Sequence, residues 1–192
     1  MFGLGIALIL EAHLGAAPWD VFHQGVSELT GISVGNVIVI TGLILLLAWI
    51  PLRQRPGIGT LLNAIEIGIV VDLVEPLLPS VEALVPRFGF LALGLVAIAA
   101  GSGLYIGSGL GAGPRDGLML GLGARGLSVR VARTVIELGV LVVGVLLGGG
   151  IGVGTVAFTF GIGPLVQWFL PPLTLPPLTH SRLSARTSTT PS

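Results

Sequence analysis

Two aspartates occupy equivalent places in a motif that occurs twice in the sequence. Residues 14–20 read LGAAPWD and residues 110–116 read LGAGPRD, so Asp20 and Asp116 each follow a proline by two positions. Because proline is favoured at the first position of a helix, both acids are expected in a first helical turn. One hypothesis is that they bind a cation, a proton or an amine beside broken membrane helices. The alternative is structural, because an acid in a first turn complements the helix dipole.

A second polar group stands in the middle of an apolar segment. Glu66 follows Asn63 and Thr60 at helical spacing, so the three are predicted to share a helix face. A carboxylate at the bilayer centre costs about 3 kcal/mol unless it faces a cavity or a partner. We therefore predict either a proton or cation site in the bundle, or a protonated glutamate that bonds to a neighbouring helix. The second half has Phe158 and Gly161 at these places, so such a site would be asymmetric.

The remaining charged and histidine residues favour structural roles. Arg133 and Glu137 are four residues apart on one predicted helix, which is the spacing of an intrahelical ion pair. His13, His23 and His180 lack the spacing of a zinc site, and the chain has no cysteine. We therefore expect no metal, no cofactor and no enzymatic activity. A net charge of zero argues against nucleic acid as a partner.

The composition is typical of a protein whose outer surface meets lipid. Only 9% of the 192 residues are charged, against about 25% in a soluble domain, and 53% are hydrophobic. The mean hydropathy is +1.01. Because a span needs about 20 apolar residues, six segments are predicted to cross the bilayer. They are residues 1–14, 34–50, 57–78, 88–108, 129–147 and 152–170.

The motif around the two aspartates belongs to a longer internal repeat. GISV at 31–34 matches GLSV at 126–129, and GIGT at 57–60 matches GVGT at 152–155. The first helix is expected to be truncated, because the start of its counterpart in the second copy would map before residue 1. The predicted organisation is repeat one at 1–78, a linker at 79–87, repeat two at 88–173 and a disordered cytoplasmic tail at 174–192.

Each repeat also contains a segment that is too short to span. Residues 18–30 and 114–125 begin with proline and end just before glycine, and a helix of about 12 residues is only about 18 Å long. We interpret both as interfacial or re-entrant helices that follow the first span of each repeat. The predicted fold class is an all-α membrane protein with six transmembrane helices, arranged as two inverted three-helix repeats.

The arginines support the inverted arrangement, which three spans per repeat would require because three is an odd number. With a cytoplasmic N-terminus, Arg87 is the only arginine in an outside segment, as the positive-inside rule predicts. The others lie in inside segments: Arg53, Arg55, Arg115, Arg125, Arg130, Arg133, Arg182 and Arg186. We therefore predict a multi-pass protein that has the lipid bilayer as its partner and both termini in the cytoplasm.

The motif LGxxPxD, followed by TGISVG at 30–35 and PGIGTLLN at 56–63, resembles the YczE/YitT family of bacterial membrane proteins, the YczE branch in particular. The resemblance covers the chain to about residue 172. It implies a protein of the bacterial plasma (inner) membrane whose function is poorly defined and commonly guessed to be transport. Members of the family usually have a longer first helix. The resemblance supplies no catalytic residues.

Two functions of different classes fit these features. The first is a transporter or permease for a small molecule or ion, with Asp20, Asp116, Asn63 and Glu66 as candidate substrate-binding residues. The alternative is a non-transporting membrane assembly or regulatory subunit, which the small size and glycine-rich helix faces permit. A membrane enzyme is disfavoured because no catalytic constellation is present. Neither interpretation fixes the oligomeric state.

Overall fold

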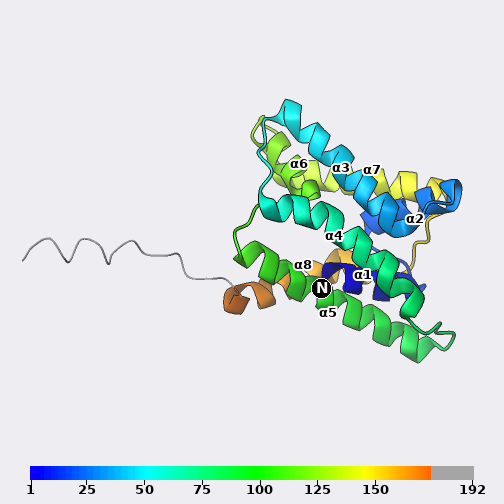
Figure 1. Ribbon diagram of the computed structural model, residues 1–192. Helices are drawn as coiled ribbons and strands as arrows, with labels where there is room; N and C mark the ends of the chain where they lie inside the picture. Colours follow the sequence, from blue (N-terminus) through cyan, green and yellow to red (C-terminus); the bar gives the residue numbers. More distant parts are fainter. Residues whose placement is uncertain (174–192) are drawn as a thin grey trace, which may run out of the picture.

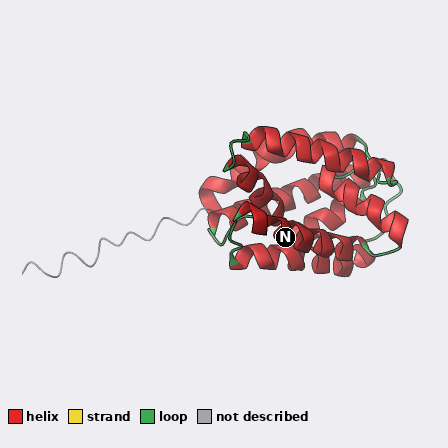
Figure 2. Ribbon diagram, turned by 90° about the horizontal axis from the view of Figure 1, so that it is seen from above, coloured by secondary structure: helices red, strands yellow, loops and turns green. Residues whose placement is uncertain are grey.

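The computed structural model describes residues 1–173, and over that range the chain forms helices and no strands. Figure 2 shows the resulting helical bundle. Its elements are α1 (Phe2–Glu11), α2 (Pro18–Thr30), α3 (Val34–Leu52), α4 (Ile58–Val74), the 3-10 helix η1 (Glu75–Leu77), α5 (Leu84–Gly107), α6 (Pro114–Gly123), α7 (Val129–Leu146) and α8 (Val153–Leu173). The predicted all-α class is confirmed. The tail predicted at 174–192 lies outside the described residues.

The boundaries of α2 follow from the residues at its two ends. Pro18 stands in the first helical turn, and Gly31 ends the helix with a φ of 72°, in the left-handed region that glycine adopts without strain. The Gly31 N–H donates to the Ser27 carbonyl at 2.8 Å. Ser33 then caps α3, because its Oγ accepts from the Asn36 N–H at 3.3 Å. α2 therefore begins and ends at the predicted residues.

Two other boundaries differ from the predicted ones. α6 ends at Gly123, two residues before the predicted Arg125. The residues that follow form tighter turns, because the N–H groups of Arg125 and Gly126 donate to carbonyls three residues earlier rather than four. α5 begins at Leu84, so the last four residues of the predicted linker are helical. Pro86 is compatible with this helix start. It lies in the first turn of α5, where its missing N–H removes no helical hydrogen bond.

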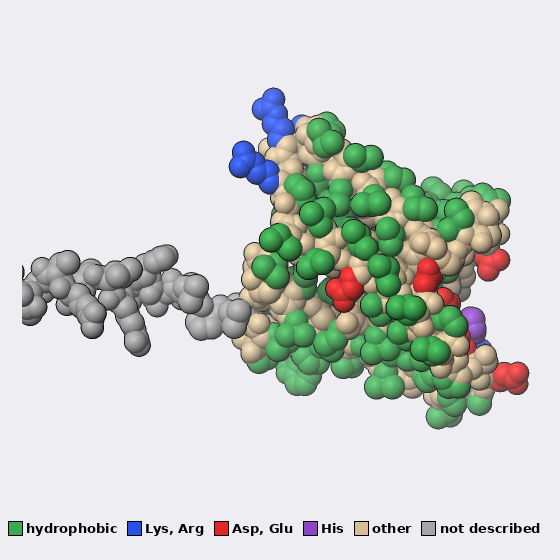
Figure 3. All heavy atoms as spheres, in the orientation of Figure 1, with side chains coloured by type: hydrophobic (Ala, Val, Ile, Leu, Met, Phe, Trp, Pro, Cys, Tyr) green, Lys and Arg blue, Asp and Glu red, His purple; other side chains and the backbone are tan. Residues whose placement is uncertain are grey.

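Three helices, α3, α5 and α8, are long and apolar enough to cross a bilayer. α1 has 10 residues, α4 has 17, and α7 carries Arg130, Arg133 and Glu137. Exposed isoleucine, leucine and valine side chains run along α3, α4, α5 and α7, and Figure 3 shows much of this apolar cover. These features indicate a membrane protein. Six crossings remain a prediction.

The helices form two layers, and in Figure 1 α1, α5 and α8 lie low, α2, α3, α6 and α7 lie high, and α4 runs between them. α1, α4, α5 and α8 pack together in one layer, and α2, α3, α6 and α7 pack together in the other. Each predicted repeat contributes two helices to each layer. Contacts also cross between repeats, because α1 packs along α5, α2 along α7 and α3 along α6. The two repeats are therefore interlocked.

Equivalent residues make reciprocal contacts across the two repeats. The N–H of Gly154 donates to the Leu14 carbonyl at 2.7 Å, and the N–H of Gly59 donates to the Leu110 carbonyl at 3.1 Å. Leu14 matches Leu110 in the repeat and Gly59 matches Gly154, so the same bond forms twice in opposite directions. The backbone contacts between the two repeats are therefore reciprocal, as a two-fold relation between them would predict.

The α3–α6 and α7–α2 interfaces are equivalent in the repeat. In each, one helix approaches a glycine of the other closely, but the glycine lies on α6 in the first interface and on α7 in the second. Trp49 of α3 covers Gly117 of α6, where a Cβ would stand 1.8 Å from a ring carbon. In the other interface, Gly144 of α7 meets the backbone of Val21 and Phe22 in α2, and a Cβ would stand 2.5 Å from the Phe22 nitrogen. Gly144 is the repeat equivalent of Trp49, and Val21 is that of Gly117. A large residue thus meets a glycine in both interfaces.

The seam between α3 and α4 joins the two layers. Gly35 and Gly68 approach so closely that a Cβ on Gly35 would stand 2.1 Å from the Gly68 carbonyl oxygen. Asp72 of α4 completes the contact at the start of α3. Its Oδ1 accepts from the Gly35 N–H at 2.8 Å, and its Oδ2 accepts from the Ser33 hydroxyl at 2.6 Å. This seam is therefore closed by both packing and hydrogen bonds.

The equivalent seam, between α7 and α8, is open. Within the described part of the chain these two helices do not pack along each other as α3 and α4 do. Arg130 and Glu137 occupy the places of Gly35 and Gly42, so charged side chains stand where glycines permit close approach in the first repeat. Gln167 replaces the acid that closes the first seam. The two layers are therefore joined on one side and separated on the other.

Candidate functional site

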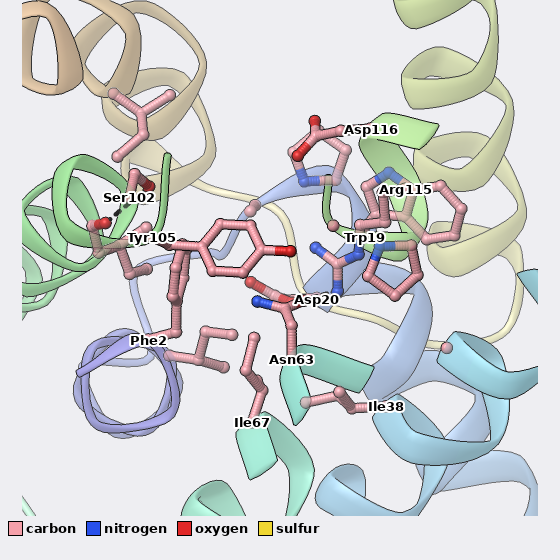
Figure 4. Close-up of a pocket in the computed structure, with 18 of the residues that line it drawn as sticks. Phe2, Trp19, Asp20, Ile38, Asn63, Ile67, Ser102, Tyr105, Arg115 and Asp116 are labelled. Atoms are coloured by element: carbon pink, nitrogen blue, oxygen red, sulfur yellow. Dashed lines mark hydrogen bonds and ion pairs between the residues drawn. The ribbon is translucent and has the colours of Figure 1, made fainter. Parts of the chain in front are cut away.

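A cavity of about 390 Å³ lies between the two layers, and all eight α-helices contribute to its lining. Several of the lining residues are repeat equivalents of one another. Such pairs are Trp19 with Arg115, Asp20 with Asp116, Asn63 with Phe158, and Ile67 with Ile162. Both members of each pair therefore line the same cavity. Figure 4 shows its polar part.

The two short helices direct their first turns at this cavity. Pro18 of α2 and Pro114 of α6 both line it, whereas residues 28–30 at the end of α2 are exposed. This placement favours the re-entrant interpretation over an interfacial helix lying on the surface. The first turn of a helix carries free N–H groups and a partial positive charge. Both repeated aspartates reach the cavity because each stands in such a turn.

Asp20 is almost fully buried, with 2% of its surface exposed. Its Oδ1 lies 3.6 Å from the Arg115 guanidinium and 3.4 Å from Nδ1 of His23. Neither contact has hydrogen-bond geometry, so this oxygen forms no hydrogen bond to a described residue. Burial lowers the pKa of His23, and the nearby Asp20 offsets this only in part, so the imidazole is neutral at pH 7. Arg115 is therefore the main counter-charge to the Asp20 carboxylate.

Arg115 is held over an aromatic ring at the centre of the site. Its guanidinium carbon lies 5.1 Å from the Trp19 ring centroid, within the range of a cation–π contact. The Nε1 of Trp19 is buried and bonds no described residue. The first turn of α6 is itself fixed, because Trp49 Nε1 donates to the buried Pro114 carbonyl at 2.9 Å. This bond positions Arg115 and the aspartate that follows it.

Asp116 lines the cavity from the first turn of α6 and forms no ion pair with a described residue. A Cβ on Gly113 would stand 3.2 Å from Asp116 Oδ2 and 3.6 Å from Asn63 Oδ1, so these two oxygens converge on one small space. The Tyr105 hydroxyl also bonds no described residue. In Figure 4 this hydroxyl reaches between the two labelled aspartates. Two acceptor oxygens thus face the space beside Gly113.

Comparison with known proteins identifies the family. The model of DUF6198, described as a family of unknown function, matches residues 1–171. This chain belongs to the DUF6198 family. No solved structure matches the chain.

Relatives of this DUF6198 protein occur in distant bacteria. The chain is 40% identical over 171 residues to an uncharacterized protein of Haemophilus influenzae, across 88% of this chain and 78% of the relative. It is 35% identical over 174 residues to the uncharacterized membrane protein YczE of Bacillus subtilis, across 89% of this chain and 81% of YczE. Its identity to the uncharacterized protein YyaS of the same organism is 30% over 178 residues, across 89% and 88% of the two chains. The resemblance to the YczE branch is confirmed.

The structure separates the polar residues that the DUF6198 sequence suggested. Asp20, Asp116 and Asn63 line the central cavity, whereas Glu66 does not. Glu66 is exposed on α4 beside a second cavity of about 340 Å³, which Asn63 also lines. Positions three apart on a helix point about 60° away from each other. Asn63 can therefore reach the central cavity while Glu66 faces outward.

Arg133 and Glu137 lie at the open α7–α8 seam. Arg133 Nε donates to Glu137 Oε1 at 2.9 Å within α7, and both residues line the central cavity. The Arg133 side chain is 56% exposed, so this pair contributes at most about 0.5 kcal/mol to helix stability. Its place in the cavity wall is therefore its more informative property.

Sequence reasoning missed four residues of the site. Trp19 and Arg115 are the variable residues of the LGxxPxD motif, and their place directly before the repeated aspartates was a usable signal. His23 follows Asp20 by three residues, so it lies on the same helix face. No feature of the sequence around Tyr105 indicated that this residue would reach the site. It reaches the site only because α5 packs along α1, where its ring meets that of Phe2 at 6.3 Å.

Proposed function

We propose that this DUF6198 protein is a permease of the bacterial inner membrane, in which two oppositely oriented three-span repeats enclose one binding cavity for a small solute. The observation that carries this proposal is the central cavity, which is lined by equivalent residues of both repeats. Transporters built from inverted repeats bind substrate at the repeat interface, beside helix N-termini. α2 and α6 supply such N-termini.

The positions of the arginines support opposite orientations of the two repeats. Arg125 donates to the Pro51 carbonyl, so the α6–α7 and α3–α4 connections share one end of the bundle. Arg87, at the start of α5, donates instead to the Ala12 and His13 carbonyls. On the face in Figure 3, basic side chains gather at one end and acidic side chains lie mainly toward the other. With a cytoplasmic N-terminus, the basic end faces the cytoplasm.

The unequal seams support a transport cycle. Asp72 and the glycines beside it close the α3–α4 seam, whereas the α7–α8 seam is open. Inverted repeats allow the two halves to exchange conformations, which exposes the binding site alternately to each side of the membrane. We propose that the closed α3–α4 and open α7–α8 seams represent one of two such states.

A flux measurement tests the permease. Solutes that accumulate or disappear in cells lacking the protein, relative to parent cells, are assayed for flux in vesicles. Asp20→Asn preserves shape but removes the buried charge, and we expect at least about a tenfold loss of flux, or about 1.4 kcal/mol, at unchanged membrane level. Glu82→Gln makes the same chemical change at an exposed loop position and should keep full flux.

Two results would contradict the permease. One is equal flux for Asp20→Asn and the parent protein. The other is no protein-dependent flux of any solute together with a stoichiometric protein partner that copurifies in detergent. That second result would favour the assembly or regulatory subunit.

A further inference from the structure

We propose that the central cavity takes a small solute bearing a protonated amine, with Asp116 and Asn63 as its ammonium subsite. This proposal rests on the permease function and names the chemical class of the substrate. Three features of the cavity support it: the balance of charge, the unsatisfied polar atoms and the convergence of acceptor oxygens.

The charged side chains of the lining leave one acid without a cation. They comprise two arginines and three acids, and the buried histidine is neutral. Arg115 lies 3.6 Å from Asp20, and Arg133 lies 2.9 Å from Glu137. Asp116 is the acid that remains without a cation among the described residues. Asp116 is exposed in the open cavity, and an excess negative charge there concentrates positive solutes.

Two deeply buried side chains indicate a polar occupant. Trp19 and Asp20 are 7% and 2% exposed and both line the cavity. Trp19 Nε1 and Asp20 Oδ1 form no hydrogen bond to any described residue. Buried polar atoms in native proteins almost always have a hydrogen-bond partner. Their lack of one at the cavity wall favours a solute with polar groups over an apolar one.

The acceptors at the start of α6 suit an ammonium group. Asp116 Oδ2 and Asn63 Oδ1 lie 3.2 and 3.6 Å from the place that a Cβ on Gly113 would take. An ammonium group has three donors and no acceptor, so it suits a space that these two acceptor oxygens face. Because residue 113 is glycine, no side chain fills that space.

The rest of the lining favours an organic cation over a metal ion. Phe2, Ile38, Ile67 and Phe158 cover apolar parts of the wall. In the described part of the chain, no group of three His, Cys, Asp or Glu residues could hold a metal ion. A zinc-type ion needs three or four such ligands, whereas an organic ammonium needs one charged contact and apolar surface for its body. The volume of about 390 Å³ is near the lower end for ligand pockets, so the solute is compact.

The proposed selectivity for a protonated amine is tested with three four-carbon probes that differ only in their end group. n-Butylamine, n-butanol and n-butyrate are added to the full chain purified in detergent at pH 7, and the melting temperature is measured against concentration. A ligand that binds only the folded state raises this temperature in a saturable way. We expect a saturable rise with n-butylamine and no saturable rise with the other two. Equal responses to all three, or a response to n-butyrate alone, would overturn the proposal.

Two independent substitutions locate the subsite. Asp116→Asn removes the charge with little change of shape, and Gly113→Ala adds a methyl group in the ammonium space. Gly113 has a φ of −61°, which alanine adopts freely, so this variant should fold. We expect each to weaken n-butylamine binding at least about tenfold, while Glu82→Gln binds as the parent protein does. Unchanged binding in both variants would overturn the proposal.

Flux of the same probes in vesicles separates this proposal from the permease. If n-butylamine binds in an Asp116-dependent manner but no solute crosses, the subsite stands and the permease fails. If a carboxylate or a neutral solute crosses in an Asp20-dependent manner and n-butylamine does not bind, the permease stands and the amine assignment fails.

Discussion

The guanidinium of Arg115 lies 5.1 Å from the ring centroid of Trp19, which is its equivalent in the other repeat. Two residues that are equivalent in the repeat thus meet in the central cavity. Two arginines at these places would repel each other, whereas the observed pair attracts through a cation–π contact. The repeat has therefore diverged at its centre, so the cavity has a charged side and an aromatic side and can hold a solute in one orientation.

Replacing Arg115 tests how much this contact stabilises the fold. Arg115→Gln leaves the buried Asp20 carboxylate without a cation, so we expect the free energy of unfolding to fall by about 1–3 kcal/mol. Arg115→Lys keeps the charge but loses the planar stacking, so its loss should be smaller. Thermal unfolding in detergent measures both. Arg55→Gln, at an exposed loop position, is the matched control, and equal stability of Arg115→Gln and this control would contradict the account.

Gly117 should be the least tolerant glycine of the α3–α6 interface. A Cβ there would stand 1.8 Å from a Trp49 ring carbon, so Gly117→Ala must displace the indole and its bond to Pro114. Overpacking of this kind costs about 1–3 kcal/mol. Gly139→Ala on α7 has no described atom within 4 Å and should be neutral or stabilising. Similar melting temperatures for the two variants would show that the Trp49 contact is misplaced.

A disulfide across the closed seam should stop transport. A Cβ on Gly42 would stand 3.3 Å from the Ala64 Cβ, close to the range of about 3.5–4.5 Å for disulfides. We expect oxidation of the Gly42→Cys, Ala64→Cys double variant to reduce flux at least about tenfold, and a reductant to restore it. The single variants control for the added side chains. Full flux in completely crosslinked protein would rule out opening of this seam during transport.

Glu75, in η1 beyond the end of α4 and outside the three helices long and apolar enough to span, should make stability depend on pH. Burial raises its pKa above 4.5, with repulsion from Asp72 and Glu11 adding to the effect and His13 opposing it. The folded state then binds the proton more tightly, so this stabilisation is complete below pH 4.5 and is lost as pH rises through the raised pKa. Glu75→Gln avoids that loss.

The predicted pH dependence of stability is measured as the melting temperature in detergent between pH 4 and pH 8. The Glu75→Gln variant should be the more stable at pH 7 and should match the parent protein below about pH 4.5. If the difference in melting temperature between Glu75→Gln and the parent protein grows as the pH falls, the predicted pH dependence has the wrong sign and is contradicted.

Local features of the structure were predictable from sequence. Proline at Pro18 and glycine at Gly31 set the limits of α2, because each acts through its own backbone geometry. The internal repeat predicted that Asp20 and Asp116 are equivalent, and both line one cavity. These signals depend on residues near one another in the chain or on direct matching of two segments.

The arrangement of the helices in space was not predictable in this way. Crossed packing of α2 on α7 and of α6 on α3 depends on contacts between residues far apart in the sequence. The outward position of Glu66 depends on how α4 is rotated in the bundle, and helical spacing alone cannot fix that rotation. The unequal seams likewise become visible only when Gly35 is seen against Gly68.

Cysteine accessibility at Glu28 and Ala124 tests the inverted, two-fold architecture most directly. The two positions are repeat equivalents, one in the last turn of α2 and one at the end of α6, and both are exposed. Because the chain contains no cysteine, each single substitution is the sole site of labelling. With a membrane-impermeant thiol reagent, Glu28→Cys should react in intact cells and Ala124→Cys only in inside-out vesicles. Reaction of both from the same side would contradict the inverted repeat and the permease built on it.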